Sequence, residues 1–370
     1  MKILHILNEI RSSGAEIMLL NTAEFWQRNK LQSHILSTGE NLGHFSKNLE
    51  DAGYTLHHIP LKNKLKYIIK LNKLIKFENF DIIHIHSEGA SLYSAIAAKL
   101  AHRNKIIRTV HHIWPKRRVL PYFKRKLFRF ISNKLLKVIA VSNSISGQKN
   151  EEDLFNSRNL LIPNWYDSNK FKPVDSNKKI SLRKKYNVDS DFLIVTSLGG
   201  NWIYKNYDLI IQAMVHLDKN TDIRYFQIGT NNESLKDLAK KLNISDKIYF
   251  WGEVSDVIPF LKMSDYYIMP SSEEGFGNSA IEALSVGLIP ILSDVKALSD
   301  FKYYYPNEII WIKPEVEDIV YALKQIEKTN NKAVVDDYER RMKQYCKTIA
   351  AFGLENGPVK YLQLYKYNEL

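Results

Sequence analysis

The chain has 370 residues, 45% of them hydrophobic and 25% charged, a composition typical of globular proteins and a length that predicts two domains. No apolar run approaches the ~18 residues of a membrane-spanning helix. The apolar start of the chain is interrupted by an acidic residue at position 9, too early for a signal peptide. Cys346 is the single cysteine, which excludes an intrachain disulfide, so we expect a cytoplasmic protein. The net charge of +13 is uneven, because residues 1–173 carry +15 and the remainder carries −2.

Short apolar runs alternate with helical periodicity in the first half, which predicts an α/β fold with a doubly wound parallel sheet. The expected strands span residues 3–7, 34–37, 55–59, 82–86, 106–110 and 138–141, with a further short run at 161–164. Helices are expected between them, for example at 15–27 and 92–101.

Two stretches of the first half, from Lys62 to Lys76 and from Trp114 to Val138, contain many basic residues and no acidic one, interleaved with apolar and aromatic side chains. Such a stretch can lie on an anionic membrane surface, at about 1 kcal/mol per basic residue near it. A solvated helix face made basic by a lysine-rich composition is the alternative. Nucleic acid is not an expected partner, since the sequence has no zinc-finger, RRM-type or bZIP pattern.

Several polar or flexible residues follow the strands of the first half. Gly14 lies in the turn after the first strand, where one glycine is a weak nucleotide-binding signal. His84 and His86 share one strand face, and we expect His84 to be a core histidine. For His86, at the carboxyl end of its strand, the core and a ligand cleft remain alternatives.

The polar residues 167–179 predict a linker, after which the alternation starts again. The expected strands of the second half span residues 192–197, 223–228, 248–251, 266–269, 289–292 and 309–312, with helices such as 207–217 and 234–242. We therefore expect two Rossmann-like domains, at 1–172 and 180–345, that face each other across a cleft at the carboxyl ends of their strands.

The most informative segment is 266–284, where a β-rich run is followed by a glycine-containing turn and then by a helical pattern. A strand, a glycine turn and a helix N-terminus present unpaired backbone N–H groups and a positive dipole end to an anion such as phosphate. Glu274 in the turn and Glu282 in the helix can accept sugar hydroxyls, so the segment predicts a nucleotide-sugar site. The alternative is structural, because Ser279 and Glu282 also have the spacing of a capping box.

This segment resembles the signature of family 4, the retaining glycosyltransferases with the GT-B fold, in which Pro-Ser, Glu-Gly-Phe-Gly and Glu-Ala stand at these offsets. The two glutamates of that signature correspond to Glu274 and Glu282. Further segments are similar to the family along nearly the whole chain, and they contain Gly14, the Thr-Val-His ending at His111, the Ala-Val-Ser ending at Ser142, the Ile-Pro-Asn ending at Asn164, and the run from Gly199 to Lys205. The chain departs from the family at Gly200, which occupies the place of an arginine, and at Trp165, where the family usually has glycine.

The resemblance implies a GT-B architecture and a role for each matching residue. Glu274, Lys205 and His111 are the expected catalytic residues, with Glu274 on a donor-sugar hydroxyl, Lys205 on the diphosphate and His111 on the donor sugar. The donor is expected to be bound by Gly14, Gly199, Gly200, Lys205, Phe276, Gly277, Asn278, Ser279 and Glu282, and the acceptor side to include His86, Ser142 and Asn164. A closing helix at about 346–370 is expected to cross back onto the first domain.

By this resemblance the chain is expected to be a retaining hexosyltransferase that moves a sugar from a nucleoside diphosphate sugar to a hydroxyl of a saccharide or lipid-linked saccharide. Capsule or cell-envelope polysaccharide synthesis at the inner membrane face is the expected setting. No metal or other cofactor is expected, because Asp189-Ser190-Asp191, which spells a metal-binding Asp-x-Asp, precedes a strand at a domain edge. Two alternatives remain open: a sugar-nucleotide 2-epimerase, which shares the fold and the donor, and a non-catalytic sugar-nucleotide-binding protein of the same fold, which the departure at Gly200 suggests.

Overall fold

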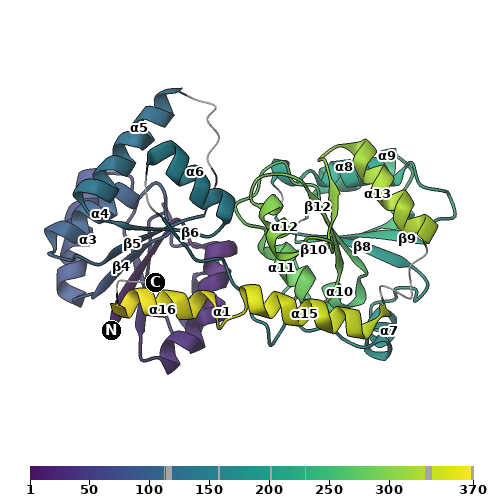
Figure 1. Ribbon diagram of the computed structural model, residues 1–370, viewed down its shortest axis with the longest axis horizontal. Coiled ribbons are helices and arrows are strands. Elements are labelled where there is room, and N and C mark those ends of the chain that lie inside the picture. Colours follow the sequence, from purple (N-terminus) through teal and green to yellow (C-terminus); the bar gives the residue numbers. More distant parts are fainter. Residues whose placement is uncertain are drawn as a thin grey trace. The chain divides into compact units, whose positions relative to one another are not determined.

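The computed structural model describes residues 1–111, 113, 119–156, 159–200, 202–229, 231–329 and 336–367. The chain forms two compact units, each an α/β unit on a parallel sheet (Figure 1). One unit comprises Met1–Trp165 together with the segment that begins at Leu354, and the other comprises Tyr166–Gly353. The predicted α/β class with two Rossmann-like domains is confirmed.

The described part of the first unit contains a seven-stranded parallel sheet in the order β3-β2-β1-β4-β5-β6-β7. Its strands are β1 (Lys2–Leu7), β2 (Gln32–Ser37), β3 (Thr55–His58), β4 (Ile82–Ile85), β5 (Ile106–Val110), β6 (Ile139–Ser142) and β7 (Asn159–Leu161). Its helices are α1 (Gly14–Arg28), α2 (Ser46–Asp51), α3 (Lys64–Glu78), α4 (Ser91–Leu100), α5 (Val119–Phe130), the π-helical turn η1 (Ile131–Leu135), α6 (Ile145–Phe155) and α16 (Gly357–Tyr367). The strand order reverses between β1 and β4, where α/β sheets commonly bind ligands.

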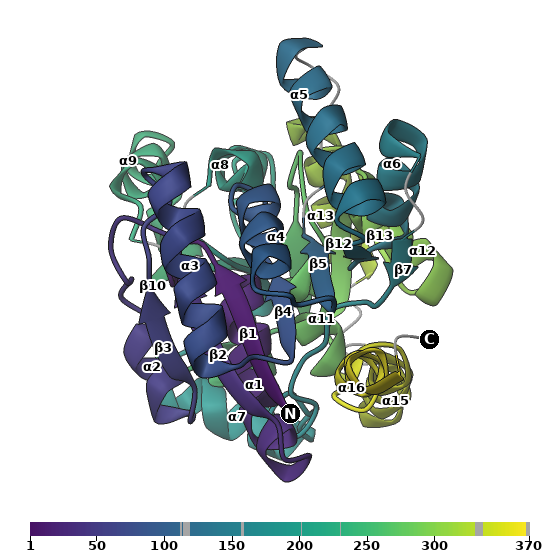
Figure 2. The ribbon, with the colours of Figure 1, turned by 90° about the vertical axis from the view of Figure 1, so that its left-hand side faces the viewer.

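Helices cover both faces of this sheet because successive strand residues point to opposite sides. Ile3 and Leu7 of β1 share a core with α1, α2 and α16, whereas Leu4 and Ile6 share a core with α3 and α4. Figure 2 shows α3 and α4 on the near face of the sheet. Trp165 is also buried, 5.7 Å between ring centroids from Tyr361 of α16, so its ring belongs to the core and not to an open acceptor surface.

The described part of the second unit contains a six-stranded parallel sheet in the order β10-β9-β8-β11-β12-β13. Its strands are β8 (Leu193–Leu198), β9 (Ile223–Ile228), β10 (Ile248–Gly252), β11 (Tyr266–Met269), β12 (Ile289–Ser293) and β13 (Ile310–Ile312). Its helices are α7 (Ser176–Lys185), η2 (Ile203–Lys205), α8 (Tyr207–Met214), α9 (Glu233–Lys241), η3 (Ser245–Lys247), α10 (Ile258–Met263), α11 (Asn278–Ser285), η4 (Leu298–Asp300), α12 (Phe301–Tyr304), α13 (Val316–Thr329) and α15 (Tyr338–Phe352). Here the order reverses between β8 and β11, so the loops after these two strands are neighbours.

The units divide at different residues from those that the sequence predicted. The first unit ends at Trp165 and not at 172, because Tyr166 and Phe171 are buried in the core of the second unit. The returning segment begins at Leu354 and not at 346, because Phe352 of α15 is buried in that same core. Only α16 packs in the first unit, so large aromatic residues, and not the polar composition around them, set both limits.

Candidate donor site of the second unit

The turn that leads from β11 into α11 is set by Gly277, whose φ of 98° is in the left-handed region. A Cβ added there would lie 2.7 Å from Leu298 Cδ2, so the position also lacks room for a side chain. Helix α11 begins directly after this glycine, with no side-chain cap among the described residues. Its first N–H groups and its positive dipole end therefore lie at the carboxyl end of β11, as the phosphate-site prediction requires.

The capping box that was the structural alternative does not form. Ser279 is inside α11, two residues after the N-cap position, which Gly277 occupies, and its hydroxyl accepts a hydrogen bond from the Tyr267 hydroxyl at 2.7 Å. Glu282 lies one turn further along the helix and is partly buried. No described group hydrogen-bonds its carboxylate, and burial raises the pKa of Glu282 to about 7.

Lys205 and Glu274 meet because β8 and β11 are neighbours in the sheet. The Lys205 ammonium donates to Glu274 Oε1 at 2.6 Å, and the Ser271 hydroxyl donates to the same oxygen at 2.8 Å. Both charged side chains are largely buried, with 12% and 10% of their surface exposed. The Asn206 side-chain amide joins the two loops again, since it donates to the Pro270 carbonyl at 2.9 Å.

Two glycines precede Lys205 at the carboxyl end of β8, and they differ in kind. Gly199 has a φ of 153°, and an added Cβ would lie 2.7 Å from the Tyr207 hydroxyl oxygen. Gly200 has no such restriction, because the only described group that a Cβ there would meet is the Trp202 indole, at 3.4 Å and 3.6 Å. The position that holds arginine in the family therefore has room for a side chain.

Phe276 is the one member of the predicted donor set whose side chain points away from any open surface. Its ring is 7% exposed and packs 5.8 Å from that of Phe352 and 6.2 Å from that of Phe301, measured between ring centroids. It anchors the glycine turn to the core, so only its backbone is available to a ligand. Asn278 is partly buried at the start of α11.

The remaining predicted residues belong to the first unit. Gly14 is exposed as the first residue of α1. His86 Nδ1 lies 3.1 Å from His111 Nε2, so the structure brings these two residues together. Ser142, whose backbone pairs with Val110 beside His111, is fully buried at the end of β6, and Asn164 is 4% exposed.

Sequence reasoning missed several residues that contact the candidate site residues, among them Tyr267, Ser271 and His5. Ser271 lies within the recognised motif, and a hydroxyl three residues before a glutamate is the pattern that could have revealed its bond to Glu274. His5 on β1 was not singled out, although its Nδ1 lies 3.1 Å from His86 Nε2. The only sequence feature that could have pointed to His5 is the presence of a polar residue within an apolar strand.

Asp189 and Asp191 lie before β8, at the opposite end of this strand from Gly199 and Lys205. Both side chains are exposed, and Asp189 Oδ1 accepts a hydrogen bond from the Asp191 backbone N–H at 2.8 Å. The pair therefore forms a surface turn at the amino end of the strand, away from the candidate site.

Two family models match consecutive parts of the chain. The model of Glycosyltransferase Family 4 matches residues 12–170, and that of Glycosyl transferases group 1 matches residues 178–348. Together they include every predicted site residue, from Gly14 to Glu282.

Relatives and a solved structure agree with these matches. The capsular polysaccharide biosynthesis glycosyltransferase CapH of Staphylococcus aureus is 24% identical over 83% of this chain and 85% of CapH. The UDP-Gal:alpha-D-GlcNAc-diphosphoundecaprenol alpha-1,3-galactosyltransferase of Escherichia coli is 28% identical over 64% of each chain. The structure of Anabaena HepE in complex with UDP and glucose shares the fold, with a TM-score of 0.82 at 16% identity, over 99% of this chain and 100% of HepE.

Proposed function

Because this chain belongs to family 4 of the glycosyltransferases and has the GT-B fold, we propose that it transfers a sugar, with retention of configuration, from a nucleoside diphosphate sugar to a hydroxyl of a saccharide or lipid-linked saccharide. One observation supports this most directly. The ammonium of Lys205 and the N-terminus of α11, both suited to a diphosphate, lie at the ends of adjacent strands, with the sugar-binding candidate Glu274 between them in the chain.

The relatives favour a uridine diphosphate sugar as the donor and an envelope saccharide as the acceptor. HepE holds UDP and glucose, and the E. coli relative is named for a UDP-Gal donor and a diphosphoundecaprenol-linked acceptor. CapH is named for capsular polysaccharide biosynthesis. We infer the same classes of donor and acceptor for this chain, in capsule or cell-envelope polysaccharide synthesis.

The proposed division of labour follows the charges of the site. Lys205 and the α11 amides would stabilise the negative charge that grows on the departing diphosphate. Glu274 would exchange its bond to Lys205 for a donor-sugar hydroxyl, Glu282 would accept the ribose hydroxyls, and His111 would donate to the sugar. Gly14, Gly199, Gly200, Gly277, Asn278, Ser279 and the backbone of Phe276 would complete the donor contacts, and His86, Ser142 and Asn164 the acceptor side.

Retention is proposed to occur by attack on the face that the diphosphate leaves. The acceptor oxygen forms the new bond to the anomeric carbon, the carbon–diphosphate bond breaks, and a diphosphate oxygen takes the hydroxyl proton. The contacts of Glu274 support this route, because a carboxylate that accepts from Ser271 and, in the proposed complex, from a donor-sugar hydroxyl is a weak nucleophile. We propose that no metal is required, since Lys205 and α11 supply the positive charge and Asp189 and Asp191 lie at the other end of β8.

A thermal-shift panel of UDP-, GDP- and ADP-sugars tests the proposal. We expect one UDP-sugar to raise the melting temperature, because a ligand that binds only the native state stabilises it. That donor should then glycosylate a lipid-linked acceptor, and NMR of the product reports the anomeric configuration. An epimeric sugar nucleotide formed without acceptor would favour the epimerase, binding without reaction would favour the non-catalytic protein, and no shift with any donor would contradict all three.

Glu282 predicts a pH dependence of donor binding. Its carboxyl group has a pKa of about 7 without ligand, and ribose hydroxyls that donate to the carboxylate would lower it. Below pH ~7 binding must then release a proton, so the affinity for UDP-glucose should rise with pH by up to about tenfold per unit and level off above pH ~7. Calorimetry at several pH values below and above ~7 measures this change in affinity. Glu282→Gln should bind more weakly and without this pH dependence, and an unchanged pH profile in that variant would remove Glu282 from the site.

The basic stretches of the first unit support a peripheral membrane surface. None of the described helices is long and apolar enough to cross a bilayer. Helix α3 buries Tyr67, Leu71 and Ile75 but leaves Leu65 69% exposed and Phe77 86% exposed. At the start of this helix a cavity of about 240 Å³ is lined by Lys62, Asn63, Lys66 and Lys70 together with Ile59, Pro60 and Tyr67. Exposed apolar groups next to lysines fit an anionic lipid surface.

One basic residue of the second stretch is not available to lipid, which corrects the sequence reading. Arg129 of α5 is 3% exposed, donates through Nε to Glu151 at 2.8 Å and pairs with Glu88 at 2.9 Å. These two carboxylates raise the pKa of Arg129 further above its usual value. On the same helix Phe123 and Leu127 are 59% and 56% exposed, and these exposed apolar side chains support the membrane proposal.

The membrane proposal is tested by removing two lysines of α3. Lys66→Ser with Lys70→Ser should weaken binding to vesicles of phosphatidylglycerol and phosphatidylcholine by about tenfold, at up to ~1 kcal/mol per charge. The matched control removes two exposed lysines of α7 in the second unit, Lys178→Ser with Lys184→Ser. Co-sedimentation compares the two, and equal losses in both variants would show a non-specific effect of net charge.

A further inference from the structure

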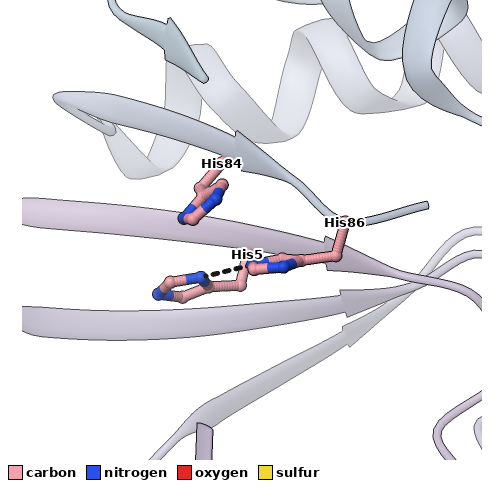
Figure 3. Close-up of side chains that lie close together, drawn as sticks. All are labelled: His5, His84 and His86. Carbon is pink, nitrogen blue, oxygen red and sulfur yellow. Dashed lines mark hydrogen bonds between the residues drawn. The ribbon is translucent and has the colours of Figure 1, made fainter. Parts of the chain in front are cut away.

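Three histidines of the first unit, His5, His86 and His111, are linked in a hydrogen-bonded chain. His5 Nδ1 lies 3.1 Å from His86 Nε2, and His86 Nδ1 lies 3.1 Å from His111 Nε2 (Figure 3 draws the first of these bonds). The chain is possible because β1, β4 and β5 are neighbours in the sheet. Its inner end is closed, since His5 is 1% exposed and no group in the described part of the chain hydrogen-bonds its Nε2.

His84 belongs to a different hydrogen-bond network, which fixes its ring beside the ring of His86. Its Nδ1 lies 2.6 Å from the Tyr365 hydroxyl and its Nε2 lies 2.8 Å from the Thr109 hydroxyl. Thr109 is in turn bonded to the Tyr361 hydroxyl at 2.6 Å, so α16 fixes this ring. The His84 and His86 rings are 4.1 Å apart between centroids, and the first ring therefore restricts the second.

The proton arrangement of the chain follows from its closed end. Burial lowers the pKa of His5 to about 3 and the pKa of His86 well below its usual value, so these rings are neutral and carry one proton each. With neutral rings, both hydrogen bonds must point in the same direction along the chain. A proton on His5 Nε2 would be a buried donor without an acceptor, which native proteins avoid more strictly than a buried acceptor without a donor. His5 therefore donates from Nδ1, and His86 donates from Nδ1 in turn.

We propose that His86, backed by His5, is a positioning residue that holds His111 in the tautomer with its proton on Nδ1 and with Nε2 as an acceptor turned toward His86. In that tautomer the Nδ1 proton makes His111 a hydrogen-bond donor and not a base for proton abstraction. This role in transfer rests on the proposed function, but the tautomer itself does not.

The same histidines suggest a metal site, because ligand atoms of His5, His84 and His86 lie within 4.8 Å of one another. The hydrogen bonds oppose that reading. Both ring nitrogens of His84 are bonded to hydroxyl groups, and a metal would have to break one of these bonds. The separation of His5 Nδ1 and His86 Nε2 is that of an ordinary hydrogen bond.

NMR of protein labelled with ¹⁵N-histidine tests the tautomer directly, without substrate, because the ring nitrogen that bears the proton has a distinct chemical shift. The His111 signals are assigned by their absence in His111→Gln. We expect His111 in the wild-type protein to carry its proton on Nδ1. A proton on Nε2 would overturn the proposal.

A matched pair of substitutions at His86 separates positioning from folding. An asparagine amide lies near the place of Nδ1 and keeps a donor for His111, whereas a glutamine amide lies near the place of Nε2 and loses it. His86→Asn should therefore keep the His111 tautomer, and His86→Gln should give a mixture of tautomers and an about tenfold lower kcat. An unchanged tautomer in a folded His86→Gln variant would overturn the proposal.

The control is a second histidine pair of the same unit. His34 Nδ1 lies 2.9 Å from His57 Nε2, and the rings are stacked, but no described bond links them to His111. His57→Gln should leave the His111 signals unchanged. If His86→Gln does not fold, His5→Leu removes the closed end and should give the same mixture.

Two further results are decisive. Stoichiometric zinc binding by the wild-type protein that His86→Gln abolishes would replace the positioning role with a metal site. Absence of sugar transfer in every variant, wild type included, would contradict the proposed function while leaving the tautomer result intact.

Discussion

Glu274→Gln is expected to lower kcat by ~10²-fold or more, if the carboxylate contacts the donor sugar in the transition state. The substitution keeps the shape of the side chain but removes the charge that holds Lys205 at 2.6 Å and accepts from Ser271 at 2.8 Å. It therefore affects the sugar contact and the position of the diphosphate-binding ammonium together. Steady-state kinetics with the donor identified by thermal shift measures the loss.

Glu273→Gln is the matched control for this experiment. Glu273 is adjacent in the chain but exposed, with no described salt bridge, so its substitution should leave kcat within about twofold. Circular dichroism of both variants establishes that they are folded, since breaking a buried ion pair can itself destabilise a protein by ~3–5 kcal/mol. Unchanged turnover in a folded Glu274→Gln variant would exclude the residue from the reaction.

Gly200→Arg is expected to increase kcat/KM for the donor by about 10- to 100-fold. The substitution restores the cation that the family has at this position, and a charge-assisted hydrogen bond to the leaving diphosphate contributes ~1.5–3 kcal/mol. The structure accepts it, because Gly200 is not in the left-handed region and, among the described residues, an added Cβ meets the Trp202 indole alone, at 3.4 Å.

Gly200→Ala separates the charge from the side chain itself, since it adds the Cβ alone and should leave kcat/KM nearly unchanged. Arginine at Gly199 is not equivalent, because φ is 153° there and a Cβ would lie 2.7 Å from the Tyr207 hydroxyl oxygen. If Gly200→Arg does not raise kcat/KM while the protein still binds the donor, the glycine does not limit activity. Backbone N–H groups then already supply the contact that the arginine makes in the family.

The sequence predicted those features that local pattern encodes. The strands of both units follow from short apolar runs, and the turn before α11 follows from Gly277, which no other residue can replace without strain. The pairing of Lys205 with Glu274 depends instead on β8 lying beside β11, which follows from strand order and not from local pattern. The resemblance to family 4 predicted a role for each residue, but only the strand order of the sheet places the two side chains in contact.

Other features escaped prediction because distant residues decide them. In the sequence Arg129 looks like one more basic residue of a basic stretch, yet its side chain is buried and forms ion pairs with Glu88 and Glu151. Phe276 reads as part of the donor motif, yet its ring fills the core. His5 carries no motif, and only the register of β1 against β4, which places it opposite His84, reveals its connection to His111.

The position of α16 has a consequence for biosynthesis. Its Tyr361 and Tyr365 complete a network on β4 and β5, but they follow the whole of the second unit in the chain. Domains usually fold in the order in which the ribosome releases them. The first unit must instead wait, with part of its apolar interior uncovered, until the second unit and the segment after Leu354 have emerged, so a nascent chain stalled before Leu354 is a candidate client for chaperones.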